Sequence, residues 1–388
     1  MTSSSRVGSP LGLARAEKRA AGALKIIAHN GAAIWGGAEI NLTHLLSGLQ
    51  RRGHEITLCC NHDIVADHAT RYLVPSIIRP LRGDLMLGDA LKFARFLRQQ
   101  QPDALVISTF KKIWLAGLAA QRAKVARTIM RVSLASDTPR RWKYRYALRH
   151  WIDVVTLNAE SMRARFLAGD PALDASKVIT LHDGVEPLRV GKAPGAVRAE
   201  LKIAPDALVI GTLARLSQQK RLERLIAVTA QLPGVHCVIA GEGTQRQRLE
   251  SAIAQHDVRE RVHLLGHRAD TGDVLGALDL LVITSDKEGM ANTMLEALWA
   301  GVPVVSTPVS GAQEALEPGP DGTPGRITAG FETQEITAAV RELLEQTAAR
   351  QEMRRAALAR ARERFSFERM VDQFESLLRG GSIARPVQ

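Results

Sequence analysis

Short apolar runs alternate along this chain with segments in which apolar residues recur every three or four positions. The run "LKIIAHN" (24–30) predicts a strand, residues 38–53 have a helical spacing that Gly53 ends, and "HEITLCC" (54–60) predicts a second strand. A strand, a helix and a strand in this order make a βαβ unit, which requires a parallel sheet with a right-handed crossover. Further strands of this half are expected at 103–109, 125–132 and 153–158, and residues 177–186 are expected to close it with a strand and a glycine turn.

A second series of the same kind starts after residue 207. Its strands are expected at 208–216, 235–243, 261–266, 279–285 and 302–308, and its helices at 221–234, 244–257 and 293–300. Strands that alternate with helices predict an α/β fold with a doubly wound sheet in each half.

The length of 388 residues also favours two domains, because one ordinary hydrophobic core rarely serves so long a chain. We expect a loose tail at 1–23, a first domain at 24–186 and a second domain at 208–364. A linker rich in proline, glycine and alanine would join the domains at 187–207. Residues 365–388 would form a C-terminal amphipathic helix that packs back on the first domain.

The composition excludes several classes of protein. Uninterrupted apolar runs stay well short of 18 residues, and the first 23 residues lack the apolar core of a signal peptide, so we expect a cytoplasmic chain without a transmembrane helix. Cys59, Cys60 and Cys237 lie in apolar runs without the spacing of a metal site, and we expect buried, reduced thiols.

The net charge of +12 is unevenly distributed. Residues 1–190 carry +13, and residues 191–388 carry −1. We therefore expect the first half, and not the second, to meet an anionic surface.

Two glutamates stand eight positions apart in "EGMANTMLEALWAGVPVVS". Glu288 follows the strand predicted at 279–285, and Glu296 lies in the second turn of a helix that Asn292 is expected to cap. Ligands of open parallel sheets bind beyond the carboxyl ends of the strands, and the free N–H groups of a helix N-terminus attract anions. Here a phosphate could bind the amides while the carboxylates accept hydrogen bonds from sugar hydroxyls. The alternative is that Glu296 interacts with the helix dipole and Glu288 is solvated surface.

Two further segments favour a phosphate ligand. "ARLSQQKRLERLI" (214–226) places Arg215 and Lys220 between a strand and a helix, where they suit a diphosphate, although such a pair can also be ordinary surface. "WGGAE" places Gly36 and Gly37 beside a helix N-terminus, where backbone without side chains can approach a phosphate closely. The segment lacks the G-x-G-x-x-G pattern with a later acid, which argues against a dinucleotide cofactor.

These segments together resemble a known family. "EGMANTMLEALWAGVPVVST" resembles the E-x7-E signature of the retaining nucleotide-sugar glycosyltransferases of family 4, and "LARLSQQKRLERLI" resembles that family's R-x4-K donor-phosphate segment. "WGGAEINLTHLLSGLQRRGHEITL", "VIAGEG" and "VHLLG" follow the family's order, so the resemblance covers nearly the whole chain from about residue 24. "FKK" (110–112) resembles the lipopolysaccharide-core glucosyltransferase branch. The resemblance implies the GT-B fold, in which two doubly wound Rossmann-like domains face each other across a cleft.

The resemblance also implies roles for individual residues. Arg215 and Lys220 would hold the donor diphosphate, Glu288 would meet the hydroxyls of the donor sugar, and Glu296 would accept hydrogen bonds from the ribose. Backbone amides near the sugar would come from Gly289, Met290, Ala291 and Asn292. From the first domain, Gly36 and Gly37 would close over the phosphates. The surroundings of the base would include Gly241, Gly243 and His267. Such enzymes typically need no metal or other cofactor, because cationic side chains and a helix dipole supply the positive field.

The chain departs from the family pattern at three places. Many relatives carry a histidine at the end of an early strand, where this chain offers only Ser108, Thr109, Arg131 or Ser133. Arg221 replaces the glycine that usually follows the phosphate-binding lysine, and Asp183 replaces the asparagine of the interdomain turn. The group that activates the acceptor is therefore open.

One segment of the first half combines cations with aromatic residues. "TPRRWKYRYALRHW" (138–151) is expected to form a basic amphipathic helix that docks on an anionic membrane. The alternative is a solvated helix with core aromatics. Nucleic acid is not expected as a partner, because no recognition module accompanies the segment. The cations are Arg140, Arg141, Lys143, Arg145 and Arg149.

The sequence thus predicts a retaining enzyme that moves a sugar from a nucleoside diphosphate to a hydroxyl of a cell-envelope glycolipid or polysaccharide at the inner face of the membrane. The acceptor would bind the first domain and the donor the second. Two rivals are a nucleotide-sugar 2-epimerase on the same fold and a non-catalytic, membrane-associated subunit of a polysaccharide assembly. The sugar, the base, the linkage and the acceptor stay open.

Overall fold

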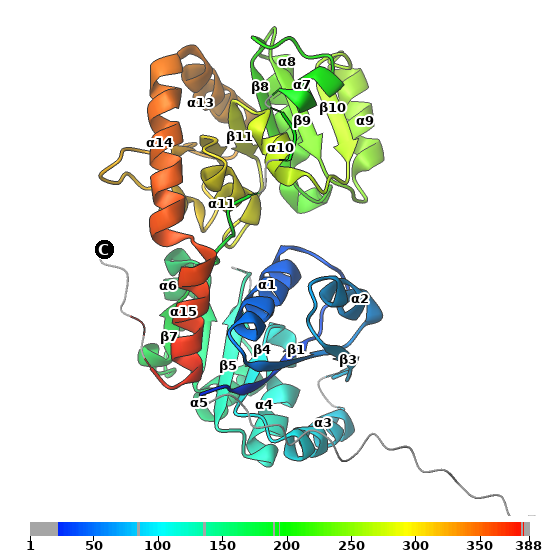
Figure 1. Ribbon diagram of the computed structural model, residues 1–388, viewed down its shortest axis with the longest axis vertical. Helices are drawn as coiled ribbons and strands as arrows, with labels where there is room; N and C mark the ends of the chain where they lie inside the picture. Colours follow the sequence, from blue (N-terminus) through cyan, green and yellow to red (C-terminus); the bar gives the residue numbers. More distant parts are fainter. Residues whose placement is uncertain are drawn as a thin grey trace, which may run out of the picture.

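The chain forms two parallel sheets in two domains, which lie one above the other in Figure 1, the computed structural model of the protein. The structure describes residues 22–83, 86–134, 137–188, 191–193, 195–381 and 383. Residues 1–21 of the predicted tail and residues 384–388 of the predicted C-terminal segment lie outside the described residues.

The first domain has a seven-stranded sheet in the order β3-β2-β1-β4-β5-β6-β7, and every pair of neighbours is parallel. Its strands are β1 Lys25–Asn30, β2 Glu55–Cys60, β3 Ser76–Ile78, β4 Ala104–Ile107, β5 Arg127–Val132, β6 Val154–Leu157 and β7 Val178–Thr180. Its helices are α1 Gly37–Arg51, α2 Asp63–Arg71, α3 Leu87–Gln100, α4 Ile113–Ala123, α5 Trp142–His150 and α6 Arg163–Ala168, with short 3-10 turns at η1 Phe110–Lys112, η2 Glu160–Met162 and η3 Ala175–Lys177.

The second domain repeats this topology with six strands in the order β10-β9-β8-β11-β12-β13, again all parallel. Its strands are β8 Val209–Leu213, β9 His236–Ala240, β10 Val262–Gly266, β11 Leu280–Ile283, β12 Val304–Ser306 and β13 Gly325–Ile327. The remaining helices are α7 Ala196–Glu200, η4 Gln218–Lys220, α8 Leu222–Ala230, α9 Arg246–Gln255, α10 Thr271–Gly276, α11 Asn292–Trp299, α12 Ala312–Leu316, α13 Thr333–Glu345, α14 Thr347–Arg364 and α15 Phe367–Leu378.

The predicted doubly wound α/β fold is confirmed in both halves. The strands that the sequence predicts are present, each within a few residues of its expected bounds. The strands β3 and β13 have no counterpart in the sequence-based prediction. Both lie at the edge of a sheet, and at most one residue of each is buried, so no buried apolar run marks them.

Alternate residues of each strand face different helices. On β1, Ile26 and Ala28 belong to the core under α1, whereas Ile27 belongs to a core on the opposite face with α3 and α4. Both faces of the sheet are therefore covered, which explains the nearly continuous apolar runs of the strands.

The last helix, α15, returns to the first domain, as its position beside the first sheet in Figure 1 shows. Its apolar residues recur at helical spacing and belong to the core under α1; they are Phe367, Met370, Val371, Phe374, Leu377 and Leu378. Arg52, just after α1, forms ion pairs with Glu368, Asp372 and Glu375 of α15. Apolar packing and charge therefore hold the end of the chain on its beginning.

The three cysteines are free and buried. Burial raises the pKa of Cys59, Cys60 and Cys237 to about 12, because a thiolate loses its hydration there. These thiols are therefore part of the packing at neutral pH and are not nucleophiles.

The close approach of α1 and α15 depends on Gly48. A Cβ atom at this position would lie 2.7 Å from Cζ of Phe367 and 2.8 Å from Cγ2 of Val371. We expect Gly48→Ala to lower the free energy of unfolding by about 1–3 kcal/mol, because overpacking displaces the helix. Thermal and urea unfolding would measure the change.

Gly276→Ala is the matched control for this substitution. Gly276 also lies in a helix and has no neighbouring atom within 4 Å of the added Cβ, so its variant should be at least as stable as the wild type. Equal stability of the two variants would contradict the proposed close packing.

Candidate active site

The loops that follow β1, β4, β8 and β11 lie where the strand order of each sheet reverses. At such a point, neighbouring loops diverge to opposite faces of the sheet and leave a crevice at its carboxyl edge. Gly36 follows β1, Arg215 and Lys220 follow β8, and Glu288 follows β11. The topology therefore gathers the predicted site residues at the two switch points.

Lys220 and Glu288 meet directly, although they are 68 positions apart in sequence. Nζ of Lys220 lies 2.5 Å from Oε1 of Glu288, and both side chains are largely buried. Lys220 also borders a small hollow between the ends of β8 and β11, together with Ala291 and Thr293. The two loops thus place a cation and a carboxylate beside the start of α11.

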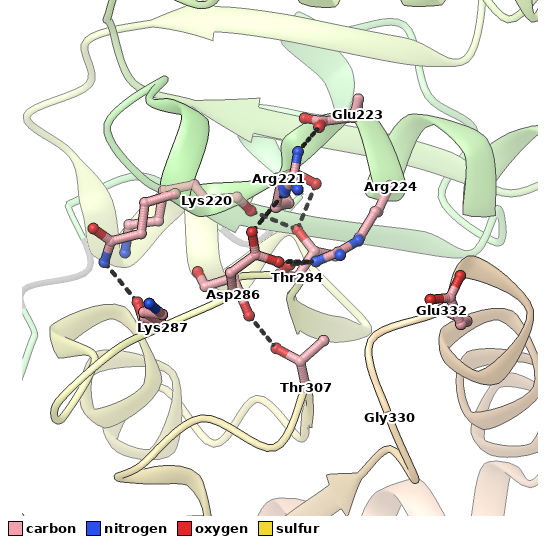
Figure 2. A network of polar contacts seen from close by, with 12 residues as sticks. Lys220, Arg221, Glu223, Arg224, Thr284, Asp286, Lys287, Thr307, Gly330 and Glu332 are labelled. Atoms are coloured by element: carbon pink, nitrogen blue, oxygen red, sulfur yellow. Dashed lines mark hydrogen bonds and ion pairs between the residues drawn. The ribbon is translucent and has the colours of Figure 1, made fainter. Parts of the chain in front are cut away.

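Asp286 ties these two loops together, as Figure 2 shows. Its carboxylate accepts hydrogen bonds from Nε of Arg221 at 2.6 Å and from Nη1 of Arg224 at 2.7 Å. Burial alone would raise the pKa of Asp286, but these bonds from Arg224 and Arg221 hold it below its ordinary value. Thr284 adds a hydrogen bond from Oγ1 to the carbonyl of Lys220 at 2.8 Å. The loop that carries Lys220 is therefore fixed at neutral pH.

Arg221 has the left-handed backbone conformation, with φ of +50° and ψ of +42°. An L-residue pays about 1–2 kcal/mol for this conformation, which is why glycine suits it. Arg221 keeps it while its side chain is held by Asp286 and by Glu223 at 3.3 Å. Where the family has a glycine, this chain therefore holds the same backbone conformation through the ion pairs of the Arg221 side chain.

Two glycines of the second domain pack against the backbone on either side of Arg215. Cβ atoms at Gly241 and Gly243 would lie 1.9 Å and 2.3 Å from the carbonyl oxygens of Ala214 and Leu216. Only glycine allows this approach of backbone to backbone on either side of Arg215. Arg215 itself is exposed, and no acidic side chain of the described residues forms an ion pair with it.

Asn292 does not cap α11 as expected, because it is the first residue of the helix and Ala291 occupies the cap position. Its side chain instead bridges the two domains. Oδ1 of Asn292 accepts a hydrogen bond from Nδ2 of Asn41 at 2.7 Å, and its amide donates to the carbonyl of Gly37 at 3.4 Å. The N-terminus of α11 therefore lies against the glycine loop of the first domain.

Gly289 is a second point of contact between the domains. A Cβ atom there would lie 2.4 Å from the carbonyl oxygen of Ser133 and 2.8 Å from Oδ1 of Asn158. Met290 and Ala291 beside it are buried. The segment 289–292 is thus packed between the domains, and its glycine is required by space.

Glu296 lies one turn into α11, on the same helix as Asn292. Desolvation raises its pKa to about 7, and no cation of the described residues offsets the burial of the carboxylate. This carboxyl therefore changes its charge near neutral pH, which marks it as a candidate functional group.

Glu39 is a candidate that the sequence-based prediction did not include. It follows Gly36 and Gly37 in the first turn of α1, and its carboxylate lies close to where a Cβ of Gly36 would be, at 3.4 Å. Burial raises its pKa, whereas hydrogen bonds and the charge of Arg215 oppose that change. Its place in "WGGAE" could have signalled it, but the facing Arg215 is 176 positions away in sequence.

Two of the departures from the family pattern lie together, one at the end of β5 and one after β7. Arg131 of β5 forms a buried ion pair with Asp183, which also accepts a hydrogen bond from Nδ2 of Asn158 at 2.9 Å. Ser108 and Thr109 instead hold the end of β1, through bonds with the carbonyl of His29 and the amide of Gly31. The side chain of Arg131 therefore has a structural role as the partner of Asp183.

The structure also shows the surroundings of His267 and of the five cations in the basic segment. His267 follows β10 and is exposed. Desolvation and the charge of Arg71 lower the pKa of His68 on α2, and His267 makes a smaller contribution in the same direction from the other domain. The five cations of the basic segment differ: Arg140 and Arg141 are exposed, Lys143 lies over the ring of Tyr144, Arg145 donates to the carbonyl of Pro139, and Arg149 pairs with the buried Asp170.

Comparison with known proteins identifies the family that shares this arrangement. A family model described as Glycosyltransferase Family 4 matches residues 35–189, and one described as Glycosyl transferases group 1 matches residues 196–360. The lipopolysaccharide core biosynthesis glycosyltransferase LpsE of Rhizobium meliloti (strain 1021) is 29% identical over 294 residues, which are 74% of this chain and 80% of LpsE. LpsD of the same organism, with the same description, is 26% identical over 51% of this chain and 57% of LpsD.

The fold has similar solved structures as well. The crystal structure of Anabaena Alr3699/HepE in complex with UDP superposes with a TM-score of 0.81 at 21% identity, over 92% of this chain and 100% of that one. From its two family models and its two opposed Rossmann-like domains, the chain is a glycosyltransferase that belongs to glycosyltransferase family 4 and has the GT-B fold.

Proposed function

We propose that this glycosyltransferase transfers a sugar, with retention of configuration, from a nucleoside diphosphate to a hydroxyl of a cell-envelope acceptor in lipopolysaccharide core biosynthesis. The observation that carries the proposal is the pairing of Lys220 with Glu288 beside the N-terminus of α11, between the two domains. A cation, a carboxylate and free helix amides in one place suit a ligand that joins a diphosphate to a sugar.

The diphosphate would bind Arg215, Lys220 and the first amides of α11. No acidic side chain of the described residues lies within ion-pair distance of Arg215, although its charge acts on Glu39, so the exposed guanidinium is available to an anion. HepE was solved with UDP, which supports a nucleoside diphosphate ligand on this fold. We propose that these groups balance the charge of the leaving diphosphate without a metal ion.

The sugar and the ribose would meet the two carboxylates. Glu288 would turn from Lys220 toward the hydroxyls of the donor sugar, while Lys220 turns toward the phosphate. Glu296 would accept hydrogen bonds from the ribose, which stabilise its ionised form.

The first domain would complete the site on the side opposite the second domain. Gly36 and Gly37 would cover the phosphates, since Gly37 already contacts Asn292 at the start of α11. Contact between the domains excludes water and so limits hydrolysis of the donor. No described side chain stands out as a base, so we propose that the acceptor hydroxyl loses its proton to the departing phosphate.

The acceptor is inferred from the relatives and from charge. LpsE and LpsD are described as lipopolysaccharide core enzymes, and the excess positive charge of this chain lies in its first half. The exposed Arg140, Arg141 and Trp142 would place the first domain on an anionic membrane at the cytoplasmic face, and Trp142 is 72% exposed. Among the described residues, no helix is long and apolar enough to cross a bilayer.

We expect Lys220→Ala and Glu288→Gln each to lower transfer by about 100-fold or more, because each removes a preorganised charge from the transition state. Initial rates with UDP-sugars and a core oligosaccharide would measure the loss, and the proton NMR spectrum of the product would give its anomeric configuration.

Arg326→Ala is the control for these variants, since it breaks an exposed ion pair with Glu342 in the same domain and should keep full activity. Wild-type rates in both site variants, with unchanged folding by circular dichroism, would remove the site assignment.

Glu296 should make nucleotide affinity depend on pH. The pKa of about 7 means that below pH 7 a bound ribose must displace a proton, so the affinity for UDP should fall by up to about tenfold per pH unit, and above pH 7 it should level off. Isothermal titration calorimetry in buffers of different ionisation enthalpy would detect the released proton.

Glu296→Gln is the control that retains the ionisation of UDP itself. Its affinity should lack the component that depends on Glu296. A pH profile identical to that of the wild type would show that Glu296 does not contact the nucleotide.

Membrane docking predicts that Trp142→Ala and Arg140→Glu reduce sedimentation with vesicles of phosphatidylcholine and phosphatidylglycerol. Each basic residue near such a surface contributes about 1 kcal/mol, so the charge reversal should lower binding by at least about fivefold at low salt. Arg259→Glu, an exposed charge reversal in the second domain, should bind like the wild type. Equal losses in all three variants would contradict docking through residues 140–142.

A further inference from the structure

We propose that a cavity in the first domain, separate from the donor site, binds a phosphate ester carried by the acceptor. The cavity has a volume of about 260 Å³ and lies between the loop that follows β3 and the helix α3. Its lining combines four cations with two aromatic rings: Arg79, Arg82, Lys92, Arg95, Phe93 and Phe96.

The charge of this cavity is strongly positive. Its one acidic residue, Asp89, is buried and accepts a hydrogen bond from the amide of Arg82 at 3.1 Å, and it lies 3.6 Å from Nε of the same residue. Within the described part of the chain, Arg79, Lys92 and Arg95 have no carboxylate in ion-pair contact. Three uncompensated cations around one hollow favour an anion.

The walls of the cavity are held in place before any ligand binds. The guanidinium of Arg79 lies over the ring of Phe96 at 5.2 Å, and Phe96 stacks on the buried Phe93. The loop is fixed at Arg82, whose carbonyl accepts a hydrogen bond from Nζ of Lys112 at 2.5 Å. A cation that is already oriented loses less freedom when it binds an anion.

Phosphate esters match this lining better than carboxylates do. Two or more arginines can donate paired hydrogen bonds to the oxygens of one phosphate, which carries more charge than a carboxylate. The volume exceeds what a bare phosphate needs and leaves room for the group that bears it. Gln99, also in the lining, offers hydrogen bonds to such a group.

The position of the cavity connects it with the acceptor. The loop after β3 and Lys112 after β4 lie at the carboxyl edge of the sheet, which is the edge that also carries Gly36 and Gly37. Leu91 of α3 is half exposed and stands one turn from Arg95, and the neighbouring Met86 and Leu87 are exposed too. Cations beside exposed apolar side chains suit an amphiphile with a phosphorylated head.

This inference rests on the proposed function for the identity of the acceptor, but the binding of phosphate can be measured alone. The first probe is glucose 6-phosphate, with glucose as its uncharged counterpart, in isothermal titration calorimetry. The second is vesicles of phosphatidylcholine with and without phosphatidic acid. The two probes distinguish a phosphate on a sugar from a phosphate on a lipid.

Arg95→Glu and Arg98→Glu are a matched pair of variants. Both residues are exposed on α3 and lie three positions apart, but only Arg95 lines the cavity. Arg95→Glu should weaken the binding of at least one phosphate probe by about tenfold or more, which corresponds to about 1.4 kcal/mol. Arg98→Glu should bind that probe like the wild type.

The possible outcomes of these measurements lead to different conclusions. A selective loss with glucose 6-phosphate assigns the site to a sugar phosphate, and a selective loss with vesicles assigns it to a lipid phosphate. Equal affinities of the two variants with both probes, or no binding of either probe by the wild type, would overturn the proposal. UDP should stabilise Arg95→Glu against heat as much as it stabilises the wild type; if it stabilises neither, the proposed donor fails while the phosphate measurement still stands.

Discussion

The paired charges of two loops determine the geometry of the whole site. The loops after β8 and β11 carry Lys220, Arg221, Asp286 and Glu288, and these side chains pair across the gap between the strands. Two loops of one sign would repel each other, and two neutral loops would have no reason to keep one arrangement. The alternating signs fix the backbone before a ligand arrives, so that a donor meets charges that need only to exchange partners.

The contacts between the domains follow from this arrangement. The N-terminus of α11 is positioned by the loop after β11, and it presents Gly289 to Ser133 and Asn292 to Asn41. Farther along, Glu314 accepts hydrogen bonds from His182 and from the amides of Glu160 and Ser161. Burial would raise the pKa of Glu314, but these bonds bring it below its ordinary value, so the contact is charged at neutral pH. Polar contacts of this kind can separate and re-form more readily than an apolar interface.

Much of the fold was predictable because local patterns determine it. Apolar runs and helical spacing gave the strands and helices around both switch points. The family resemblance, and not the pattern, implied that Lys220 and Glu288 would meet one ligand, and the structure pairs them. The edge strands β3 and β13 were not predictable, because they lack the buried apolar run that marks the equally short β7 and β12. Asn292 shows a different limit: its type is typical of a helix cap, yet its tertiary partner Asn41 took the side chain. Glu39 shows the same limit, since the charge that faces it comes from another domain.

The departures from the family pattern were visible in the sequence, but their meaning was not. In the sequence, Asp183 replaces the family's asparagine and Arg131 lies in the region where many relatives carry a histidine. Only the structure shows that these two side chains pair with each other. Arg221 likewise stands at a position where the backbone suits glycine, and the carboxylate that anchors it is 65 positions away. Long-range partners of this kind have no local signature.

The return of α15 to the first domain has a consequence for the order of events during synthesis. The ribosome completes residues 25–180 long before it reaches residue 378, and until then the face of α1 that packs on α15 at Gly48 is uncovered. The early half of the nascent chain must therefore wait, with apolar surface open to water or to a chaperone, through the translation of the entire second domain.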